Sequence, residues 1–289
     1  MLSPFNASRI DRISSPLIGN GYIFDLLRDD LIHPIVSGNK WRKLKYIVDF
    51  ALQHQKSHLV SFGGAYSNHL VALAYAGKHF GLQTSGFVRG DEERPLNHYE
   101  ELCIKNGMQL IKTSRTDYRN KQALFDAHFG NDTTALFVNE GGDHPMALPG
   151  CAEILDELPL TYDIILLSLG TGTTMEGLVK AIVERNLPTK VWGISSLKNN
   201  FELDRKMEKY PASVYQIFHD YHRGKYAKSD TELIHFIQNF YKETGIKTDT
   251  VYTGKMLMAL DDLINKGQIT KDQKVLCIHT GGLLAYPAQ

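Results

Sequence analysis

A run of small residues, Gly-Thr-Gly-Thr-Thr, follows the apolar stretch YDIILLSLG and precedes MEGLVKAIVE. The apolar stretch is typical of a buried strand, and the segment after the run has the pattern of a helix. Glycines let the backbone N–H groups of such a loop converge, threonine hydroxyls add donors, and the helix N-terminus adds partial positive charge. We therefore predict a phosphate-binding loop, with a plain strand-to-helix turn as the alternative. Its residues are Gly170, Thr171, Gly172, Thr173 and Thr174.

A dinucleotide site is the rival interpretation of this loop. The glycines are spaced G-x-G-x-x-x-x-G rather than G-x-G-x-x-G. The next predicted strand ends at Ser195 and Ser196, so no acidic residue stands ready to bind a ribose hydroxyl. The spacing therefore disfavours a nucleotide-dependent oxidoreductase and favours a site for a single phosphate.

A lysine is the second candidate for chemistry. Lys40 lies in HPIVSGNKWRKLKYIVDFAL, directly behind Ser37-Gly38-Asn39, where a loop is expected to enter a helix. Lys40 and the three basic residues after it could all form the solvated face of that helix. A lysine used in chemistry must instead lose its proton near neutral pH, which a desolvated position anchored by a loop favours.

Three further stretches place polar side chains where predicted strands end and helices begin. A serine or asparagine at a helix start is often only an N-cap, and a buried tyrosine is usually packing. Each stretch by itself therefore carries little weight. The residues are Ser67, Asn68 and His69 in VSFGGAYSNHLVALA, Tyr252 and Thr253 in TDTVYTGKMLMALDDL, and Thr280 in KVLCIHTGG.

Short apolar runs alternate with helix-length segments along the whole chain. The predicted strands are 57–64, 83–90, 108–114, 134–142, 162–170, 190–196 and 274–282, and the predicted helices are 69–81, 95–107, 177–186 and 231–245. This alternation predicts an α/β protein with open, mostly parallel sheets and helices on both faces. Ligands bind such sheets beyond the carboxyl ends of the strands, which is where the candidate residues lie.

The composition is that of an ordinary globular protein of 289 residues, 43% hydrophobic and 22% charged. Lys+Arg and Asp+Glu both number 32, so the basic excess of a nucleic-acid binder is missing. The apolar runs are short for a membrane span, and the first residues do not resemble a secretory signal. Three cysteines are too few for a disulfide framework or a zinc site. We expect a cytoplasmic protein with buried reduced thiols, no metal, and neither nucleic acid nor membrane as a partner.

Taken together and in order, SGNKWRKLKY, FGGAYSNHL, GTGTT and VYTGKM with HTGG resemble the pyridoxal 5′-phosphate enzymes of the tryptophan synthase β-like fold. The nearest branch is the 1-aminocyclopropane-1-carboxylate deaminase and D-cysteine desulfhydrase group. The resemblance implies two domains with the cofactor bound between them. The large domain would comprise residues 1–45 and 155–289, and the small domain residues 46–154. Because the family often forms homodimers, we expect a homodimer.

The resemblance also implies roles for the cofactor-binding residues. Lys40 would be the lysine that bonds covalently to the cofactor. Asn68 would donate a hydrogen bond to the 3′ oxygen of the cofactor, and the loop from Gly170 to Thr174 would bind the phosphate. Thr280, in H-T-G-G, would contact the pyridine nitrogen.

Further roles concern the substrate, a small amino acid. Ser67 would lie near its carboxylate or α-carbon, with Asn68 and His69 beside it. Tyr252 and Tyr226 would be the two active-site tyrosines, although RGKYAKSD around Tyr226 departs from the usual G-Y-G of the family.

The position of Thr253 bears on the choice of substrate. In the deaminases of this group a glutamate at that position faces the pyridine nitrogen, and a neutral hydroxyl there would give a weaker electron sink. We therefore predict α,β-elimination, most simply D-cysteine to pyruvate, sulfide and ammonia. The alternatives are deamination of 1-aminocyclopropane-1-carboxylate, elimination or racemisation of another amino acid, and a protein that keeps the cofactor pocket but has lost activity.

Overall fold

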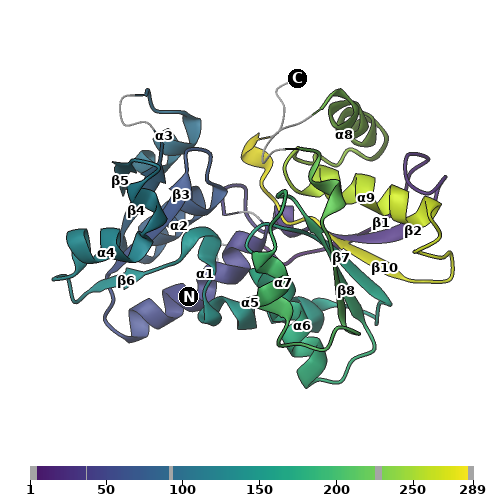
Figure 1. Ribbon diagram of the computed structural model, residues 1–289, viewed down its shortest axis with the longest axis horizontal. Coiled ribbons are helices and arrows are strands. Elements are labelled where there is room, and N and C mark those ends of the chain that lie inside the picture. Colours follow the sequence, from purple (N-terminus) through teal and green to yellow (C-terminus); the bar gives the residue numbers. More distant parts are fainter. Residues whose placement is uncertain (1–4, 37, 91–93, 225–229, 286–289) are drawn as a thin grey trace. The chain divides into compact units, whose positions relative to one another are not determined.

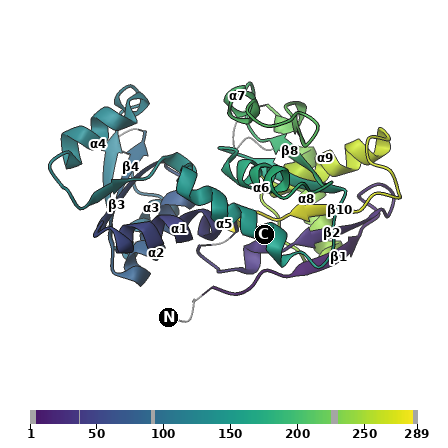
Figure 2. The ribbon, with the colours of Figure 1, turned by 90° about the horizontal axis from the view of Figure 1, so that it is seen from below.

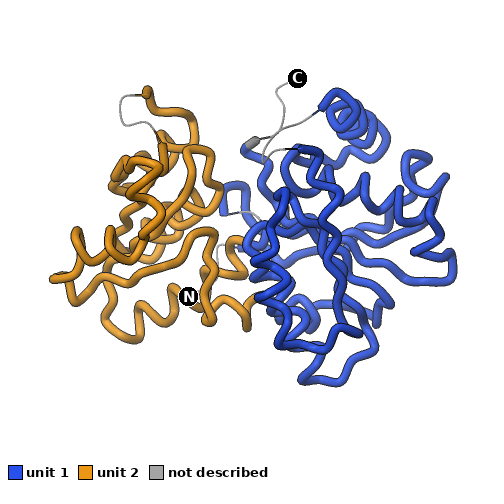
Figure 3. Tube along the Cα trace, in the orientation of Figure 1, with its two compact units in different colours: residues 1–39, 151–289 blue, residues 40–150 orange. Residues whose placement is uncertain are grey.

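The computed structural model describes residues 5–36, 38–90, 94–224 and 230–285. The chain forms two compact units, one of residues 1–39 and 151–289 and the other of residues 40–150 (Figure 3). The predicted domain boundaries at residues 45 and 155 differ from these. Helix α1 (Asn39–Gln53) runs through position 45 without a break, so the continuity of the helix keeps its first turns with the second unit. The assignment of the units as a large cofactor domain and a small domain stays a prediction.

The first unit contains a six-stranded sheet in the order β1-β2-β10-β7-β8-β9 (Figure 1). β1 pairs antiparallel with β2, and the other neighbours are parallel. The central strand β7 reads IILLSL and is buried throughout, as expected for a strand covered on both faces. The strands are β1 (Ile10–Ser14), β2 (Ile23–Leu27), β7 (Ile164–Leu169), β8 (Lys190–Ser195), β9 (Tyr215–Phe218) and β10 (Val275–Ile278).

Helices cover both faces of this sheet (Figure 1 and Figure 2). Ile164 and Leu166 of β7 pack in one apolar cluster with α8 (Thr231–Thr244) and α9 (Thr253–Asn265). The alternate residues of β7, Ile165 and Leu167, pack in a second cluster with α6 (Thr173–Glu184) and α7 (Glu202–Met207). The period of two along β7 thus divides the core of this unit between the two faces.

The second unit contains a four-stranded, fully parallel sheet in the order β5-β4-β3-β6. Phe62 and Phe87 pack on the face that α4 covers, and Gly63 and Gly86 approach Leu70 of α2 on the other. The strands are β3 (His58–Gly64), β4 (Gln83–Arg89), β5 (Met108–Thr113) and β6 (Ala135–Phe137). The helices are α1, α2 (Asn68–Phe80), α3 (His98–Lys105) and α4 (Lys121–Phe129), and the short α5 (Leu148–Ala152) spans the boundary between the units.

The predicted class, α/β with mostly parallel sheets and helices, is confirmed. Two strands were predicted too long: the segment 134–142 contributes only β6, and the segment 274–282 contributes only β10. In both segments a pair of glycines with positive φ turns the chain, at +72° and +71° for Gly141 and Gly142 and at +79° and +87° for Gly281 and Gly282. The three cysteines are buried and free, as expected. Within the described residues, no helix has both the length and the apolar character of a membrane span, and no three His, Cys, Asp or Glu side chains are grouped to hold a metal.

Candidate active site

The loop after β7 leads directly into the first turn of α6. Gly172 is the N-cap of this twelve-residue helix and has a φ of +79°. The hydroxyls of Thr171 and Thr173 lie 2.8 Å apart, and the side chains of Thr173 and Thr174 are buried. Hydroxyls and helix N–H groups therefore gather at the carboxyl end of a central strand, an arrangement suited to an anion.

Two glycines let this loop lie close to its neighbours. A Cβ atom on Gly172 would stand 2.7 Å from Cδ2 of Leu203, and the positive φ would add backbone strain. A Cβ atom on Gly170 would stand 3.3 Å from Oη of Tyr252. The phenol of Tyr252 therefore lies against the loop that is predicted to bind phosphate.

The residues before Lys40 are fixed to both the loop and the H-T-G-G turn. A Cβ atom on Gly38 would stand 1.7 Å from the carbonyl oxygen of Thr280, so only glycine fits there. The backbone N–H of Asn39 donates to that same carbonyl at 3.2 Å, and its side-chain amide donates to Oγ1 of Thr174 at 3.2 Å. Lys40 follows Asn39 by one peptide bond, and its bond to the cofactor stays a prediction.

The first turns of α1 are not a solvated basic face. Arg42 and Lys43 are each only 3% exposed, and Lys40 is half-buried. The ammonium group of Lys43 donates to the carbonyl of Gly141 at 3.2 Å. This burial disfavours the alternative in which Lys40 is one more surface charge.

The polar residues at the start of α2 have distinct surroundings. Ser67 is the N-cap, and its hydroxyl accepts the N–H of Leu70 at 3.2 Å. Asn68 is the first helical residue and is half-buried. The capping role expected of a serine is therefore present, and the substrate role of Ser67 stays a prediction beside it.

His69 is held against β3 as a neutral ring. Its Nε2 lies 2.8 Å from the hydroxyl of Ser61, which itself donates to the carbonyl of Val138 at 2.7 Å. Ser61 must then accept from His69, so the proton is on Nε2. Burial, together with the charges of Lys40 and Lys43, holds the pKa of His69 well below its usual value. Nδ1 is buried and has no hydrogen-bond partner among the described residues.

Tyr252 and Thr253, at the start of α9, donate their backbone N–H groups to a carboxylate. Asp249 accepts the backbone N–H groups of Val251, Tyr252 and Thr253 at 2.7, 2.6 and 3.0 Å. Thr253 is fully buried, and its hydroxyl has no hydrogen-bond partner within the described part of the chain. An unpaired hydroxyl in such a place calls for a polar partner that the described residues do not supply.

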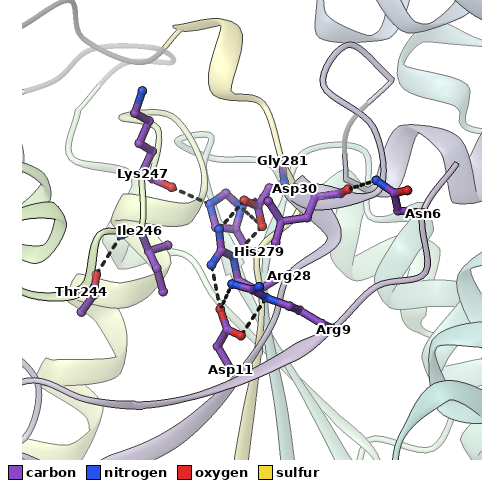
Figure 4. Close-up of polar contacts among 11 residues, drawn as sticks. Asn6, Arg9, Asp11, Arg28, Asp30, Thr244, Ile246, Lys247, His279 and Gly281 are labelled. Atoms are coloured by element: carbon purple, nitrogen blue, oxygen red, sulfur yellow. Dashed lines mark hydrogen bonds and ion pairs between the residues drawn. The ribbon is translucent and has the colours of Figure 1, made fainter.

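The turn that carries Thr280 is held by the histidine before it (Figure 4). Nε2 of His279 donates to the carbonyl of Lys247 at 2.7 Å, and Nδ1 accepts the N–H of Gly281 at 3.2 Å. The hydroxyl of Thr280 lies 3.4 Å from that of Ser168, at the end of β7. β10 and β7 are parallel neighbours, so Thr280 and the loop lie at the same edge of the sheet.

A buried ion pair lies beside this histidine (Figure 4). Arg28 donates to both carboxylate oxygens of Asp30 at 2.8 and 2.7 Å, and to Asp11 at 2.8 Å. Oδ1 of Asp30 stands 3.8 Å from Nδ1 of His279. The bidentate pair fixes the segment after β2 next to the H-T-G-G turn.

In the first unit, the structure brings together four of the predicted elements: the loop, Tyr252, Thr253 and Thr280. Tyr226 lies outside the described residues. Sequence reasoning missed Asn39 and Asp249. The side-chain amide of Asn39, next to Lys40, donates to Thr174, and the carboxylate of Asp249 accepts the backbone N–H of Tyr252. Both residues lie in the motifs SGNK and TDTVYTG. The partner of Asn39 is distant in the sequence, and the partners of Asp249 are backbone groups, so neither bond leaves a pattern in the sequence.

Residues 15–281 match the model of a family described as pyridoxal-phosphate dependent enzyme. The chain belongs to this family. A Thermotoga maritima protein named as a candidate 1-aminocyclopropane-1-carboxylate deaminase is 28% identical over 100% of this chain and 96% of its own. The 1-aminocyclopropane-1-carboxylate deaminase of Bradyrhizobium diazoefficiens is 26% identical over 96% of this chain and 92% of its own.

A solved structure of an ACC deaminase homologue superimposes with a TM-score of 0.84 at 25% identity, over 97% of this chain and 90% of that one. A solved pyridoxal 5′-phosphate-dependent aspartate racemase, at 15% identity and a TM-score of 0.69, shares the fold. The predicted resemblance to the deaminase and desulfhydrase group is therefore confirmed. The protein is an enzyme, and its cofactor is pyridoxal 5′-phosphate.

The residues of this pyridoxal-phosphate dependent enzyme fit the cofactor. The loop from Gly170 to Thr174 supplies N–H and hydroxyl donors for a phosphate. Lys40, which follows the bonded Asn39, would supply an amine for an aldehyde. Thr280, whose hydroxyl lies near that of Ser168, would offer a neutral hydroxyl to a ring nitrogen.

Proposed function

We propose that the enzyme catalyses α,β-elimination on a small amino acid, with D-cysteine as the substrate. D-cysteine and water would give pyruvate, hydrogen sulfide and ammonia, so atoms and charge balance. The observation that carries this proposal is Thr253, a buried neutral hydroxyl at the position where deaminases of the group have a glutamate.

The carboxylate of Asp249 is already bonded to the backbone of this turn. Both oxygens of Asp249 accept backbone N–H groups, from Val251 and Tyr252 on one oxygen and Thr253 on the other. Asp249 is therefore a poor candidate to replace the missing glutamate. With Thr280 as its partner and no carboxylate at position 253, a ring nitrogen would share a neutral hydrogen bond rather than gain a proton.

Different residues of the chain have different roles in the proposed reaction. Bound pyridoxal phosphate supplies an electron sink for the electron pair released at the α-carbon. Lys40 would hold the cofactor covalently, and its amine, when free, would take the α-proton. The loop from Gly170 to Thr174 binds the phosphate and fixes the cofactor. Asn68 and Ser67 bind the 3′ oxygen and the substrate, with His69 beside them, and Thr280 supports the ring nitrogen.

The tyrosines complete the proposed site. Tyr252, placed against Gly170, would contact the reacting amino acid, and Tyr226 would be the second tyrosine. With a shallow electron sink, a thiolate can still leave the β-carbon, because it is a good leaving group. A homodimer and a cytoplasmic location stay part of the proposal.

Deamination of 1-aminocyclopropane-1-carboxylate is the second candidate, because several relatives bear that name. A plant relative from Arabidopsis thaliana is named as bifunctional for both activities and is 26% identical over 95% of this chain and 76% of its own. Opening the cyclopropane ring expels a carbon, a far poorer leaving group than a thiolate, and this substrate has no α-proton. The neutral hydroxyl of Thr253 disfavours that harder reaction.

Parallel assays of the two substrates on one preparation test the proposal. We expect sulfide and pyruvate from D-cysteine and little or no 2-oxobutanoate from 1-aminocyclopropane-1-carboxylate. The physical reason is the weaker electron sink that a hydroxyl partner provides. Lys40→Ala protein with the same amount of added cofactor measures the background release of sulfide.

Faster turnover of the cyclopropane acid than of D-cysteine would show that the interpretation of Thr253 is wrong. If neither reacts, but another amino acid changes the visible absorbance of the bound cofactor, the substrate assignment fails and the family assignment is unaffected.

A further inference from the structure

The N-terminus of α9 lacks the usual kind of cap. An N-cap residue is normally short and polar, and its own side chain accepts a backbone N–H of the first turn. Ser67 does this for α2. At α9 the N-cap is Tyr252, with φ of −121° and ψ of −80°, and its side chain makes no capping hydrogen bond.

Asp249 supplies the missing acceptor from three residues upstream. Its Oδ1 accepts the N–H groups of Val251 and Tyr252 at 2.7 and 2.6 Å, and its Oδ2 accepts that of Thr253 at 3.0 Å. Its backbone carbonyl accepts the N–H of Gly254 at 3.0 Å. A Cβ atom on Gly254 would stand 2.6 Å from that carbonyl oxygen, so the turn closes only around a glycine.

The carboxylate is completely buried, which makes its bonds strong and its loss costly. Two of the three N–H contacts are as short as contacts to charged acceptors usually are. Burial raises the pKa of Asp249, while the three N–H groups and His279 oppose that rise. The neighbouring charge of Lys255, whose ammonium group donates to the carbonyl of His222 at 2.8 Å, also favours the ionised form.

Because Asp249 caps the helix, the N-cap position itself is open to a large side chain. That side chain is the phenol of Tyr252, which lies against Gly170 in the phosphate loop. We propose that Asp249 is a positioning residue: its carboxylate sets the backbone of Tyr252 so that the phenol stands at the reacting amino acid. The inference rests on the proposed function for the role of Tyr252, and it assigns no direct contact between Asp249 and substrate or cofactor.

The test uses Asp249→Asn, which replaces one of the two acceptor oxygens by an amide donor. We expect kcat to fall on the order of tenfold to a hundredfold, as for a displaced catalytic group, with KM nearly unchanged. The matched control is Asp163→Asn, because Asp163 accepts the backbone N–H of Lys274 at 2.7 Å at the opposite end of the same sheet. That variant should keep the wild-type kcat.

A double-mutant cycle separates positioning from simple capping. In a Tyr252→Phe background, Asp249→Asn should have no further effect on kcat, because the group it positions is already gone. If the two effects instead multiply, or if Asp249→Asn loses only thermal stability, Asp249 is no more than a helix cap.

A second readout needs no substrate. In protein labelled with 3-fluorotyrosine, the ¹⁹F resonance missing from Tyr252→Phe identifies Tyr252. This resonance should shift in Asp249→Asn and keep its position in Asp163→Asn. A resonance that does not move in Asp249→Asn would overturn the proposal, and this result does not depend on whether D-cysteine is the substrate. If Asp249→Asn does not fold, Asp249→Ser, which keeps one acceptor oxygen, replaces it in both experiments.

Discussion

Replacing Lys40 by alanine is expected to lower turnover by about a thousandfold or more, the scale of a lost proton-transferring group. Lys40 follows Asn39, which is hydrogen-bonded to Thr174 and to the carbonyl of Thr280. Its amine therefore starts from a fixed backbone. Initial rates with D-cysteine at saturating added cofactor measure the effect.

Lys45→Ala is the matched control, because Lys45 lies in the same helix and carries the same charge. It should keep turnover close to wild type. Equal losses in the two variants, or an active Lys40→Ala protein, would contradict the role assigned to Lys40.

Gly172→Asp is expected to weaken cofactor binding at least tenfold. The new carboxylate would stand at the N-cap of α6, where the phosphate is predicted to bind. Repulsion between two charges about 4 Å apart costs ~1 kcal/mol in water and ~4 kcal/mol near a protein surface. Because about 1.4 kcal/mol is a tenfold change in affinity, the effect should be large. Titration of the cofactor-free protein with pyridoxal phosphate measures it.

Gly172→Ala separates charge from shape. Both variants place a Cβ atom about where it would stand 2.7 Å from Leu203, at a φ of +79°. Alanine should therefore reproduce the strain and the loss of stability without the repulsion. If the folded aspartate variant binds the cofactor as tightly as the alanine variant, the phosphate binds elsewhere.

Several parts of the fold could be predicted because local pattern and burial agree. The uninterrupted apolar run of β7 predicts a central parallel strand, and the glycines after it predict a turn into α6. β1, β2 and β9 were not predicted, since they are short and only partly buried and so give a weaker apolar pattern. The segment after β6 was taken for strand because its glycines resemble the ends of the other strands.

Some residues of the candidate site could likewise be predicted from the sequence, and others could not. Lys40, Ser67 and Thr280 could be found because they lie in short motifs at the ends of predicted elements. The function of Asp249 could not, because it depends on three backbone N–H groups meeting one carboxylate, a matter of turn geometry. Asn39 presents the same difficulty, since its partner Thr174 is 135 residues away.

The central claim is that Lys40 holds the cofactor, and borohydride reduction followed by peptide mapping tests it most directly. Reduction should bleach the visible absorbance of the purified protein and leave a pyridoxyl group on Lys40. The strongest competitor among the described lysines is Lys255, which is buried and whose pKa burial lowers. A pyridoxyl group on Lys255, Lys43 or Lys45 in place of Lys40 would contradict the account.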